Sequence, residues 1–304
     1  MTASLRALLA GSIDYAGLFP PASLTLEPAL RNHAEYVRSA DSWMLGAFIL
    51  PFAKFDEASD RLAEFDVAHR LRISALGSKT DDPAQFFSAL RTGVGSIKEF
   101  NQRHGANASI DQIELPLPNR AGVAMTELHE ALTAWDAPIF LEAGPDDAER
   151  VIATIAEHQG DARGRRVGFK LRTGGVVASA FPSSIQIARA LVAAAKHRVP
   201  IKFTAGLHHP IRHFHPSVQT KMHGFLNVLG AGVLGAEHNW DVQETAAMLE
   251  DEDPASFVCD DDAFAWRGKK LTAERIKAQR ELVTSLGSCS FDDPREDLRA
   301  LNLF

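Results

Sequence analysis

The sequence predicts an α/β protein built as a (β/α)8 TIM barrel, with a large insertion between strands 7 and 8. Short apolar runs closed by Pro, Gly or polar residues alternate with segments of helical spacing, and seven such strands lie between Asp14 and Lys202. Strands that alternate with helices form a parallel sheet, and seven or eight such units favour a barrel over an open sheet. We therefore expect one barrel domain spanning residues 1–304.

The first half of the chain is expected to supply four strands and the helices that follow them. The run at 43–50 is continuously apolar, as expected for a strand buried on both faces. Asp82 before Pro83 marks the start of a helix, because Asp caps a first turn and Pro is tolerated there. We predict strands at 12–19, 43–50, 71–76 and 109–117, and helices at 26–38, 55–65 and 82–105.

The second half completes the predicted barrel. The expected helices are 126–135, 146–159 and 183–198, with strands at 138–144, 167–172, 200–204 and 286–291 and a last helix ending near residue 301. Residues 207–271 form the predicted insertion, on the catalytic face at the C-terminal ends of the strands. It contains a histidine-rich loop, a Gly-interrupted apolar helix at 225–234, an acidic helix near 241–250 and a hairpin around 257–266.

Composition limits the possible partners. The chain is 45% hydrophobic and 23% charged, and its net charge of -7 argues against a nucleic-acid-binding surface. Cys259 and Cys289 cannot make a disulfide framework or a CxxC metal motif, so a reducing cytoplasm is the expected compartment. No apolar segment approaches membrane-spanning length. We expect a small-molecule substrate, no nucleic acid and no membrane.

Two lysines lie near the C-terminal ends of adjacent predicted strands. The alternation of a strand places Lys170 on the same face as Arg172, and Lys202 on the same face as Thr204. Inward residues at these strand ends line the active site of a barrel. Crowded cations would lower a lysine pKa and free an amine to attack a carbonyl. Alternatively, the lysines bind a substrate phosphate or carboxylate, or pair with a core carboxylate.

Short motifs on seven of the predicted strands follow one another in order. They are Ile13-Asp14, the apolar run closed by Pro51, Ile113-Glu114, Glu142-Ala143-Gly144, Lys170 with Thr173-Gly174, Lys202 with Ala205-Gly206, and Gly287-Ser288-Cys289-Ser290. This series resembles deoxyribose-phosphate aldolase and related class I aldolases. Three features depart from that family: Glu114 replaces an aspartate, and Ala205 and His208-His209 replace a phosphate-binding glycine and its loop.

The resemblance implies a lyase that makes or breaks a carbon–carbon bond through a lysine Schiff base, without a cofactor. It implies Lys170 as the nucleophile, Lys202 as the charge that keeps Lys170 deprotonated, and Glu114 and Asp14 as the proton relay. The segment around Ser288 would bind an anion such as a sugar phosphate. The residues expected to bind substrate are Glu142, Arg172, Gly174, Gly206, His208, His209, Ser288 and Ser290.

Purely structural roles for the same polar residues also remain open. Glu114, Glu142 and Asp14 could merely neutralise the lysines and Arg172. Ser288 and Ser290 could cap the last helix.

Two other function classes also remain open. The loop with His208, His209, His213 and His215 could bind a divalent metal together with Glu142 or Glu114, as in a metal-dependent lyase or hydrolase. We favour substrate contacts or loop hydrogen bonds for these histidines and assign no metal. A third class is a non-catalytic binding or assembly protein that uses the insertion as its interface, for instance in a homo-oligomer.

Overall fold

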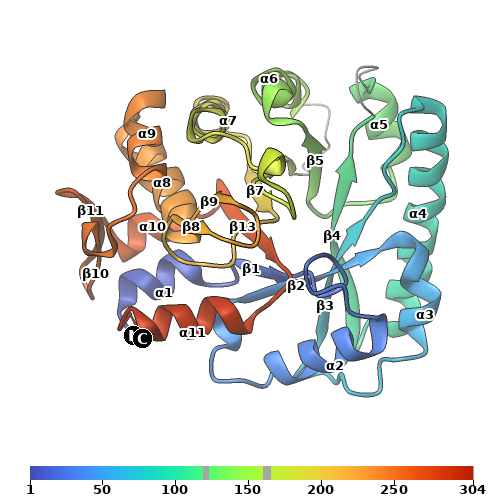
Figure 1. The fold of residues 1–304 in the computed structure, drawn as a ribbon. Coiled ribbons are helices and arrows are strands. Elements are labelled where there is room, and N and C mark those ends of the chain that lie inside the picture. Colours follow the sequence, from blue (N-terminus) through green and yellow to red (C-terminus); the bar gives the residue numbers. More distant parts are fainter. Residues whose placement is uncertain (119–122, 160–165, 304) are drawn as a thin grey trace.

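Eight parallel strands close into a barrel in the computed structural model, which describes residues 1–118, 123–159 and 166–303 (Figure 1). The ring runs from β1 through β2, β3, β4, β5, β6 and β7 to β13, and β13 pairs with β1. The strands are β1 (Ile13–Tyr15), β2 (Leu45–Pro51), β3 (Leu71–Leu76), β4 (Ala108–Pro116), β5 (Ile139–Ala143), β6 (Val167–Arg172), β7 (Ile201–Thr204) and β13 (Val283–Ser288). The predicted (β/α)8 barrel is confirmed.

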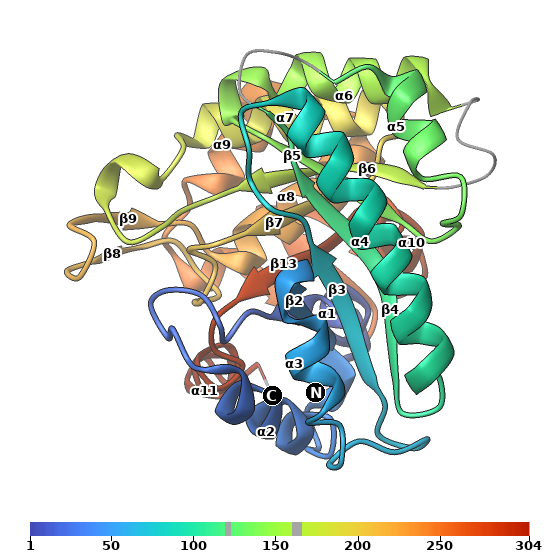
Figure 2. The same cartoon turned by 90° about the vertical axis from the view of Figure 1, so that its right-hand side faces the viewer.

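Helices surround this barrel, and α4 runs along its outside next to β4 (Figure 2). They are α1 (Ala3–Leu9), α2 (Leu26–Tyr36), α3 (Phe55–Ser59), α4 (Pro83–His104), α5 (Met125–Ala131), α6 (Ala148–Glu157), α7 (Ser184–His197), α8 (Phe225–His238), α9 (Val242–Leu249), α10 (Ala273–Gln279) and α11 (Asp292–Ala300). Side chains cap the first turns of α4 and α7. The Asp82 carboxylate accepts the Ala84 N–H, and Ser183 forms a capping box with Gln186.

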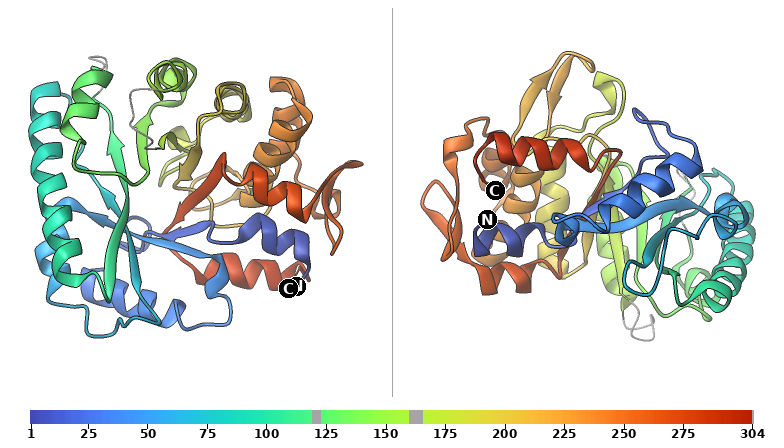
Figure 3. Two further views of the ribbon diagram at one scale, coloured as in Figure 1. Left: turned by 180° about the vertical axis from the view of Figure 1, so that it is seen from behind. Right: turned by 90° about the horizontal axis from the view of Figure 1, so that it is seen from below.

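The chain between β7 and β13 adds two small sheets and three helices to the barrel. Strands β8 (His213–His215) and β9 (Thr220–Met222) form a hairpin that projects at the left of Figure 2. Strands β10 (Phe257–Cys259), β11 (Ala263–Trp266) and β12 (Lys269–Thr272) form an antiparallel sheet. Helix α10 then packs against α1, and the two helices are seen from behind in Figure 3.

Helix α8 is apolar because it is buried between other elements. It contacts α7, α9, α10 and β13. A Cβ on Gly230 would lie 2.5 Å from a Met248 side-chain carbon, and one on Gly232 would lie 2.7 Å from a Val283 methyl group. The glycines therefore permit close packing of the helix against its neighbours. No helix within the described ranges is long and apolar enough to cross a membrane.

Several predicted elements have different boundaries in the structure, and three of them show the physical reason. The helix expected at 55–65 ends at Ser59 because the following hydrogen bonds, such as Phe65 N–H to Leu62 O, are those of tight turns. Strand β1 stops at Tyr15 because the chain then turns, and the Phe19 N–H donates to Ala16 O. The last strand lies at 283–288 and not at 286–291, since Ser288 pairs with Tyr15 and α11 begins soon after it.

Candidate functional site

The strand register brings three charged residues to one level of the barrel. Lys170 of β6 is the Cα partner of Lys202 of β7, and Glu142 of β5 is the Cα partner of Lys170. The side chain of Lys202 is fully buried, and that of Lys170 is only 3% exposed. Three neighbouring strands therefore carry one carboxylate and two amines side by side inside the fold.

Glu114 of β4 joins the two lysines. Its Oε1 lies 2.5 Å from Lys202 Nζ, and its Oε2 lies 2.6 Å from Lys170 Nζ. We expected the cations to crowd one another, but a carboxylate lies between them. Ammonium groups this deeply buried require counter-charges, because an unpaired charge is far more costly in the interior than in water.

Asp14 of β1 provides the second counter-charge for Lys202. Its Oδ2 lies 2.8 Å from Lys202 Nζ and accepts a hydrogen bond from the Ser285 hydroxyl at 2.7 Å. Its Oδ1 accepts the Ala47 N–H at 2.7 Å. A Cβ at residue 46 would lie 2.2 Å from this Oδ1, so Gly46 makes room for the carboxylate.

Together these residues form the lysine–carboxylate centre, which consists of Asp14, Glu114, Glu142, Lys170 and Lys202. Three further residues that contact it were not identified from the sequence. The Ser74 hydroxyl donates to Glu114 Oε1 at 2.5 Å, and the Phe140 ring lies 5.2 Å from Lys202 Nζ. Ser74 is a polar residue between the apolar Ile73 and Ala75 in a predicted strand, which is a signal that could have identified it. Ser285 was missed because the last strand was predicted to begin one residue after it.

The exposure of the side chains shows which part of the centre lies nearest to solvent. Arg172 is 54% exposed, and one of its guanidinium nitrogens lies 3.5 Å from Glu142 Oε1. Glu142 is 15% exposed, and its Oε2 lies 2.7 Å from Lys170 Nζ. Lys170 is thus the lysine nearer to solvent, while Lys202 lies behind it.

The charge states follow from these contacts. Burial raises the pKa of Glu114, but the two neighbouring ammonium groups lower it more, to about 2. Burial lowers the pKa of Lys202, but the Asp14 and Glu114 carboxylates raise it more, so it lies above its usual value. At neutral pH, Glu114 is therefore a carboxylate and Lys202 an ammonium.

The loops after β6 and β7 pack tightly against each other at the predicted Gly174 and Gly206. A Cβ on Gly174 would lie 2.6 Å from the Phe181 ring and 2.9 Å from the Cα of Gly206, which has a φ of 75°. The Thr173 hydroxyl donates to Ala205 O at 2.7 Å, which ties the two loops together. These glycines allow the close approach of two backbones.

The predicted Ser288 and Ser290 lie apart from the lysine–carboxylate centre in their hydrogen bonding. Ser288 Oγ is 3.1 Å from His208 Nδ1, and burial lowers the pKa of His208 to about 4. Ser290 Oγ accepts the Asp293 N–H at 3.1 Å and so caps α11. The first turn of α11 contains Asp292 and Asp293, whose negative charges oppose a phosphate at this helix end.

The remaining histidines form a cluster of their own. One ring nitrogen each from His209, His213 and His215 lies within 4.8 Å of the others, and all three rings are partly buried. The carboxylates that we considered as additional metal ligands contact the lysines instead: Glu114 bridges both, and Glu142 contacts Lys170. The metal alternative built on those carboxylates is therefore wrong in its ligand set.

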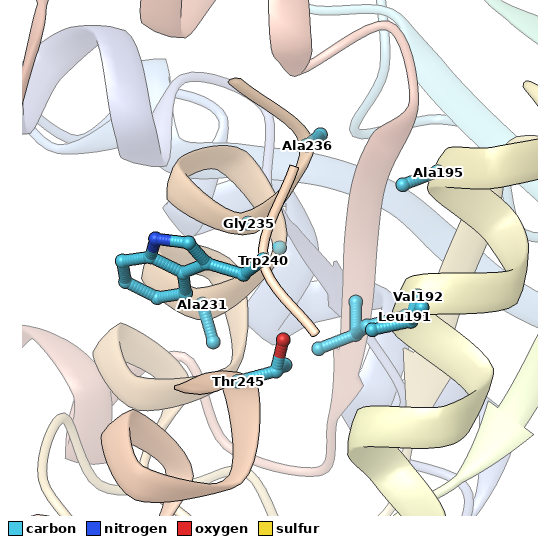
Figure 4. A pocket seen from close by; sticks show the side chains of 9 residues that line it. Leu191, Val192, Ala195, Ala231, Gly235, Ala236, Trp240 and Thr245 are labelled. Atoms are coloured by element: carbon cyan, nitrogen blue, oxygen red, sulfur yellow. The ribbon is translucent and has the colours of Figure 1, made fainter. Parts of the chain in front are cut away.

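A narrow cleft lies elsewhere, among α7, α8 and the chain that leads into α9 (Figure 4). Its lining is mostly small or apolar, with Leu191, Ala231 and Trp240 among the contributing residues. The Thr245 hydroxyl, seen in Figure 4, already donates to Asp241 O at 2.7 Å. Among the residues that the structure describes, none with a titratable side chain lines this cleft.

The fold and this centre define a parallel (β/α)8 barrel with paired lysines and carboxylates in its interior. No family model matches the chain, and no curated protein matches it significantly. Among solved structures it is similar to Yersinia pestis DHPS with a pterine-sulfa conjugate, at 11% identity and a TM-score of 0.44, over 97% of this chain and 94% of that one. The fold assignment rests on the strand order and register of the chain itself.

Proposed function

We propose that this protein is a class I aldolase-like lyase that acts on a small carbonyl compound through a Schiff base on Lys170. The observation that supports this best is the pair of buried lysines in register, joined by Glu114, with Lys170 nearer to solvent than Lys202. Lys170 also stands in the Lys-x-x-Thr-Gly pattern shared with that family.

The charges around Lys170 suit the cation that a Schiff-base mechanism needs. Lys170 Nζ lies 2.6 Å from Glu114 Oε2 and 2.7 Å from Glu142 Oε2. A protonated Schiff base carries its positive charge at the same nitrogen as the resting ammonium. The two carboxylates can therefore stabilise the iminium without any rearrangement of the site, which is preorganised electrostatic stabilisation.

The first step requires a neutral amine. In our proposal, Lys170 gives one proton to Glu142, and the amine lone pair then forms a bond to the carbonyl carbon. The carbonyl oxygen takes up a proton from the attacking nitrogen and becomes the hydroxyl of a carbinolamine. This hydroxyl leaves as water with a proton returned by Glu142, and the nitrogen lone pair forms the iminium double bond.

Bond cleavage then uses the iminium as an electron sink. The electron pair of the carbon–carbon bond moves toward the iminium to give an enamine, while the substrate hydroxyl loses its proton and becomes a second carbonyl. Glu114 accepts that proton and later returns it to the enamine carbon, and hydrolysis frees Lys170. Lys202 holds Glu114 and Asp14 in place throughout, with Nζ distances of 2.5 and 2.8 Å.

The substrate is proposed to enter past Arg172. This guanidinium is half exposed beside Glu142, where it can pair with an anionic group of a substrate, such as a phosphate or carboxylate. Gly174, Gly206 and His208 belong to the loops that follow β6 and β7, Ser288 is the last residue of β13, and these four remain proposed substrate contacts. We further propose that residues 207–271 are the part of the single domain that sets substrate choice.

Trapping with borohydride tests the proposal. The purified protein is incubated with a panel of small aldehydes and ketones, some with phosphate or carboxylate groups, then reduced and mapped by peptide mass spectrometry. We expect a stable adduct on Lys170 that is absent from Lys170→Ala and unchanged in Lys221→Ala, a control at a surface lysine. Turnover retained by Lys170→Ala, or no adduct with any carbonyl, would contradict the assignment.

A further inference from the structure

We propose that His209, His213 and His215 bind one divalent first-row transition-metal ion, of the Zn²⁺ type, at a site that is separate from the lysine–carboxylate centre. One nitrogen of each ring lies within 4.8 Å of the other two. The ring centroids are 4.5, 5.6 and 5.7 Å apart, so the three imidazoles form a compact triangle. Among the described residues, this is the only group of three or more potential ligands so arranged.

The backbone holds these rings together. His213 and His215 are alternate residues of β8, so their side chains leave the same face of the strand, while Phe214 between them is 54% exposed. Pairing with β9, in which His215 is opposite Thr220, fixes the strand. Two ligands of the site therefore come from one short hairpin with a defined register.

The third ligand is held against the start of α8. The Phe225 N–H donates to His209 O at 2.9 Å, and the Leu226 N–H donates to Pro210 O at 2.9 Å. The buried Asn227 accepts the Arg212 N–H at 2.9 Å. The segment between His209 and β8 is thus tied to a buried helix, and the triangle does not depend on a loosely held loop.

Hydrogen bonds at Nδ1 leave the other ring nitrogen free in two of the histidines. His209 Nδ1 is 2.5 Å from Asp297 Oδ2, and His213 Nδ1 is 3.1 Å from Ile211 O. A carboxylate and a carbonyl only accept, so each Nδ1 carries the hydrogen, and in the neutral ring Nε2 keeps its lone pair. Metal-binding histidines usually have such a partner at the second nitrogen, which orients the ring and makes it more basic.

The third histidine, His215, is held at the same ring nitrogen, but this nitrogen accepts a hydrogen bond. Its Nδ1 accepts the Ser217 N–H at 3.3 Å and lies 2.7 Å from Ser217 Oγ, so in the neutral ring Nε2 carries the hydrogen. Binding of a metal ion at Nε2 therefore requires this hydrogen to move to Nδ1, where the Ser217 hydroxyl can accept it. In the described part of the chain, no partner hydrogen-bonds Nε2 of any of the three rings. Each ring thus keeps one nitrogen that has no hydrogen-bond partner among the described residues, and three such rings close together suit a metal ion.

The donor set indicates the class of ion. Imidazole nitrogens are typical ligands of Zn²⁺, Cu²⁺, Ni²⁺ and Co²⁺, whereas Mg²⁺ and Ca²⁺ take oxygen ligands. Three protein ligands leave at least one coordination position for water or a ligand oxygen. The site begins next to His208, which contacts Ser288 at the end of β13, so it borders the catalytic face of the barrel.

Metal titration of the full chain tests the site. Protein stripped with a chelator is titrated with Zn²⁺ against a chromophoric chelator, and with Co²⁺ while the visible absorption is recorded. We expect one equivalent of each metal and intense Co²⁺ bands typical of four-coordinate geometry. His213→Ala and His209→Ala should weaken binding at least 100-fold, and Asp297→Asn, which keeps the side-chain size, about 10-fold to 100-fold.

Two matched variants complete the design. His238→Ala removes a histidine that is hydrogen-bonded to Lys270 O, away from the cluster, and should bind metal like the wild type. Lys170→Ala should also bind metal normally, which separates this site from the proposed Schiff-base function. Wild-type binding below one equivalent, or unchanged binding in folded Asp297→Asn and His213→Ala, would overturn the proposal.

Discussion

The lysine–carboxylate centre and the histidine cluster are built in opposite ways. The centre collects single residues from five strands, β1, β4, β5, β6 and β7, and each buried charge faces a charge of opposite sign. The histidine cluster takes all three rings from residues 209–215, and its polar partners occupy only one nitrogen of each ring. In the first arrangement the protein itself balances the buried charges. In the second, each ring keeps one nitrogen without a hydrogen-bond partner among the described residues.

This difference bears on how each region depends on its surroundings. A buried ion pair is broken at a high cost when one partner is removed, because the other partner stays charged in the interior. A cluster with unpaired ring nitrogens has little effect on the free energy of unfolding without a ligand, and this free energy rises when a ligand binds the folded state. We therefore expect the centre to respond most to substitution and the cluster to respond most to added metal.

The largest effect is expected from Lys202→Met. The change leaves Asp14 and Glu114 buried without the ammonium between them, and we expect the free energy of unfolding to fall by about 3–5 kcal/mol. Lys170→Met should lower the free energy of unfolding by less, because Glu142 is 15% exposed and also contacts Arg172. Urea unfolding monitored by circular dichroism compares the two variants, and equal losses would contradict the burial gradient.

Acid should weaken the same centre. The pKa of Glu114 is lowered from 4.5 to about 2 in the folded protein, so its contribution is complete above about pH 4.5 and is lost as the pH falls toward 2. The loss is on the order of 3 kcal/mol. Unfolding measured from pH 6 to 2 should show a shallower pH dependence in Glu114→Gln and no change in Glu127→Gln, a half-exposed control.

Metal should stabilise the histidine cluster by a smaller amount. Zn²⁺ at about 100 times its Kd should raise the free energy of unfolding by about 2.7 kcal/mol, because it binds the folded state. Thermal unfolding with and without a chelator measures the gain. His213→Ala should lose it and Lys170→Met should keep it, whereas a gain that survives in His213→Ala would place the metal elsewhere.

The smallest effect is expected at the open edge of the centre. Arg172→Ala removes a guanidinium that is 54% exposed and 3.5 Å from Glu142 Oε1, so stability should change by only about 0.5 kcal/mol. Borohydride trapping should still label Lys170, but an anionic carbonyl compound should be trapped less efficiently than a neutral one of the same size. Equal trapping of both would remove Arg172 from the proposed entry path.

The sequence was sufficient for the barrel because its pattern is repeated along the whole chain. The alternation of strands and helices is visible in every unit, and the lysines at 170 and 202 fell at the same level because adjacent parallel strands run in register. The position of Glu114 between the lysines could not be derived this way. It depends on side-chain reach across β4 to β7 and not on spacing along one strand.

The roles of the histidines were also beyond the sequence. The spacing of His213 and His215 indicated a shared face only if residues 213–215 formed a strand, and no strong strand pattern marks this short segment. The approach of His209 depends on hydrogen bonds to the start of α8, which are set by tertiary packing. Similarly, Gly46 looks like an ordinary glycine in sequence, although Asp14 occupies the space that a Cβ would need.

The contact between Asp14 and Lys202 also constrains how the protein is made. The two residues lie 188 positions apart, and the Ser285 hydroxyl that completes the arrangement comes later still, on the strand that closes the ring. During synthesis, a chain that has emerged only through β6 contains Asp14 and Glu114 but not their shared ammonium. Long-range closure of this kind slows folding. The interior charges thus become mutually compensated only after β7 and β13 have emerged and the ring can close.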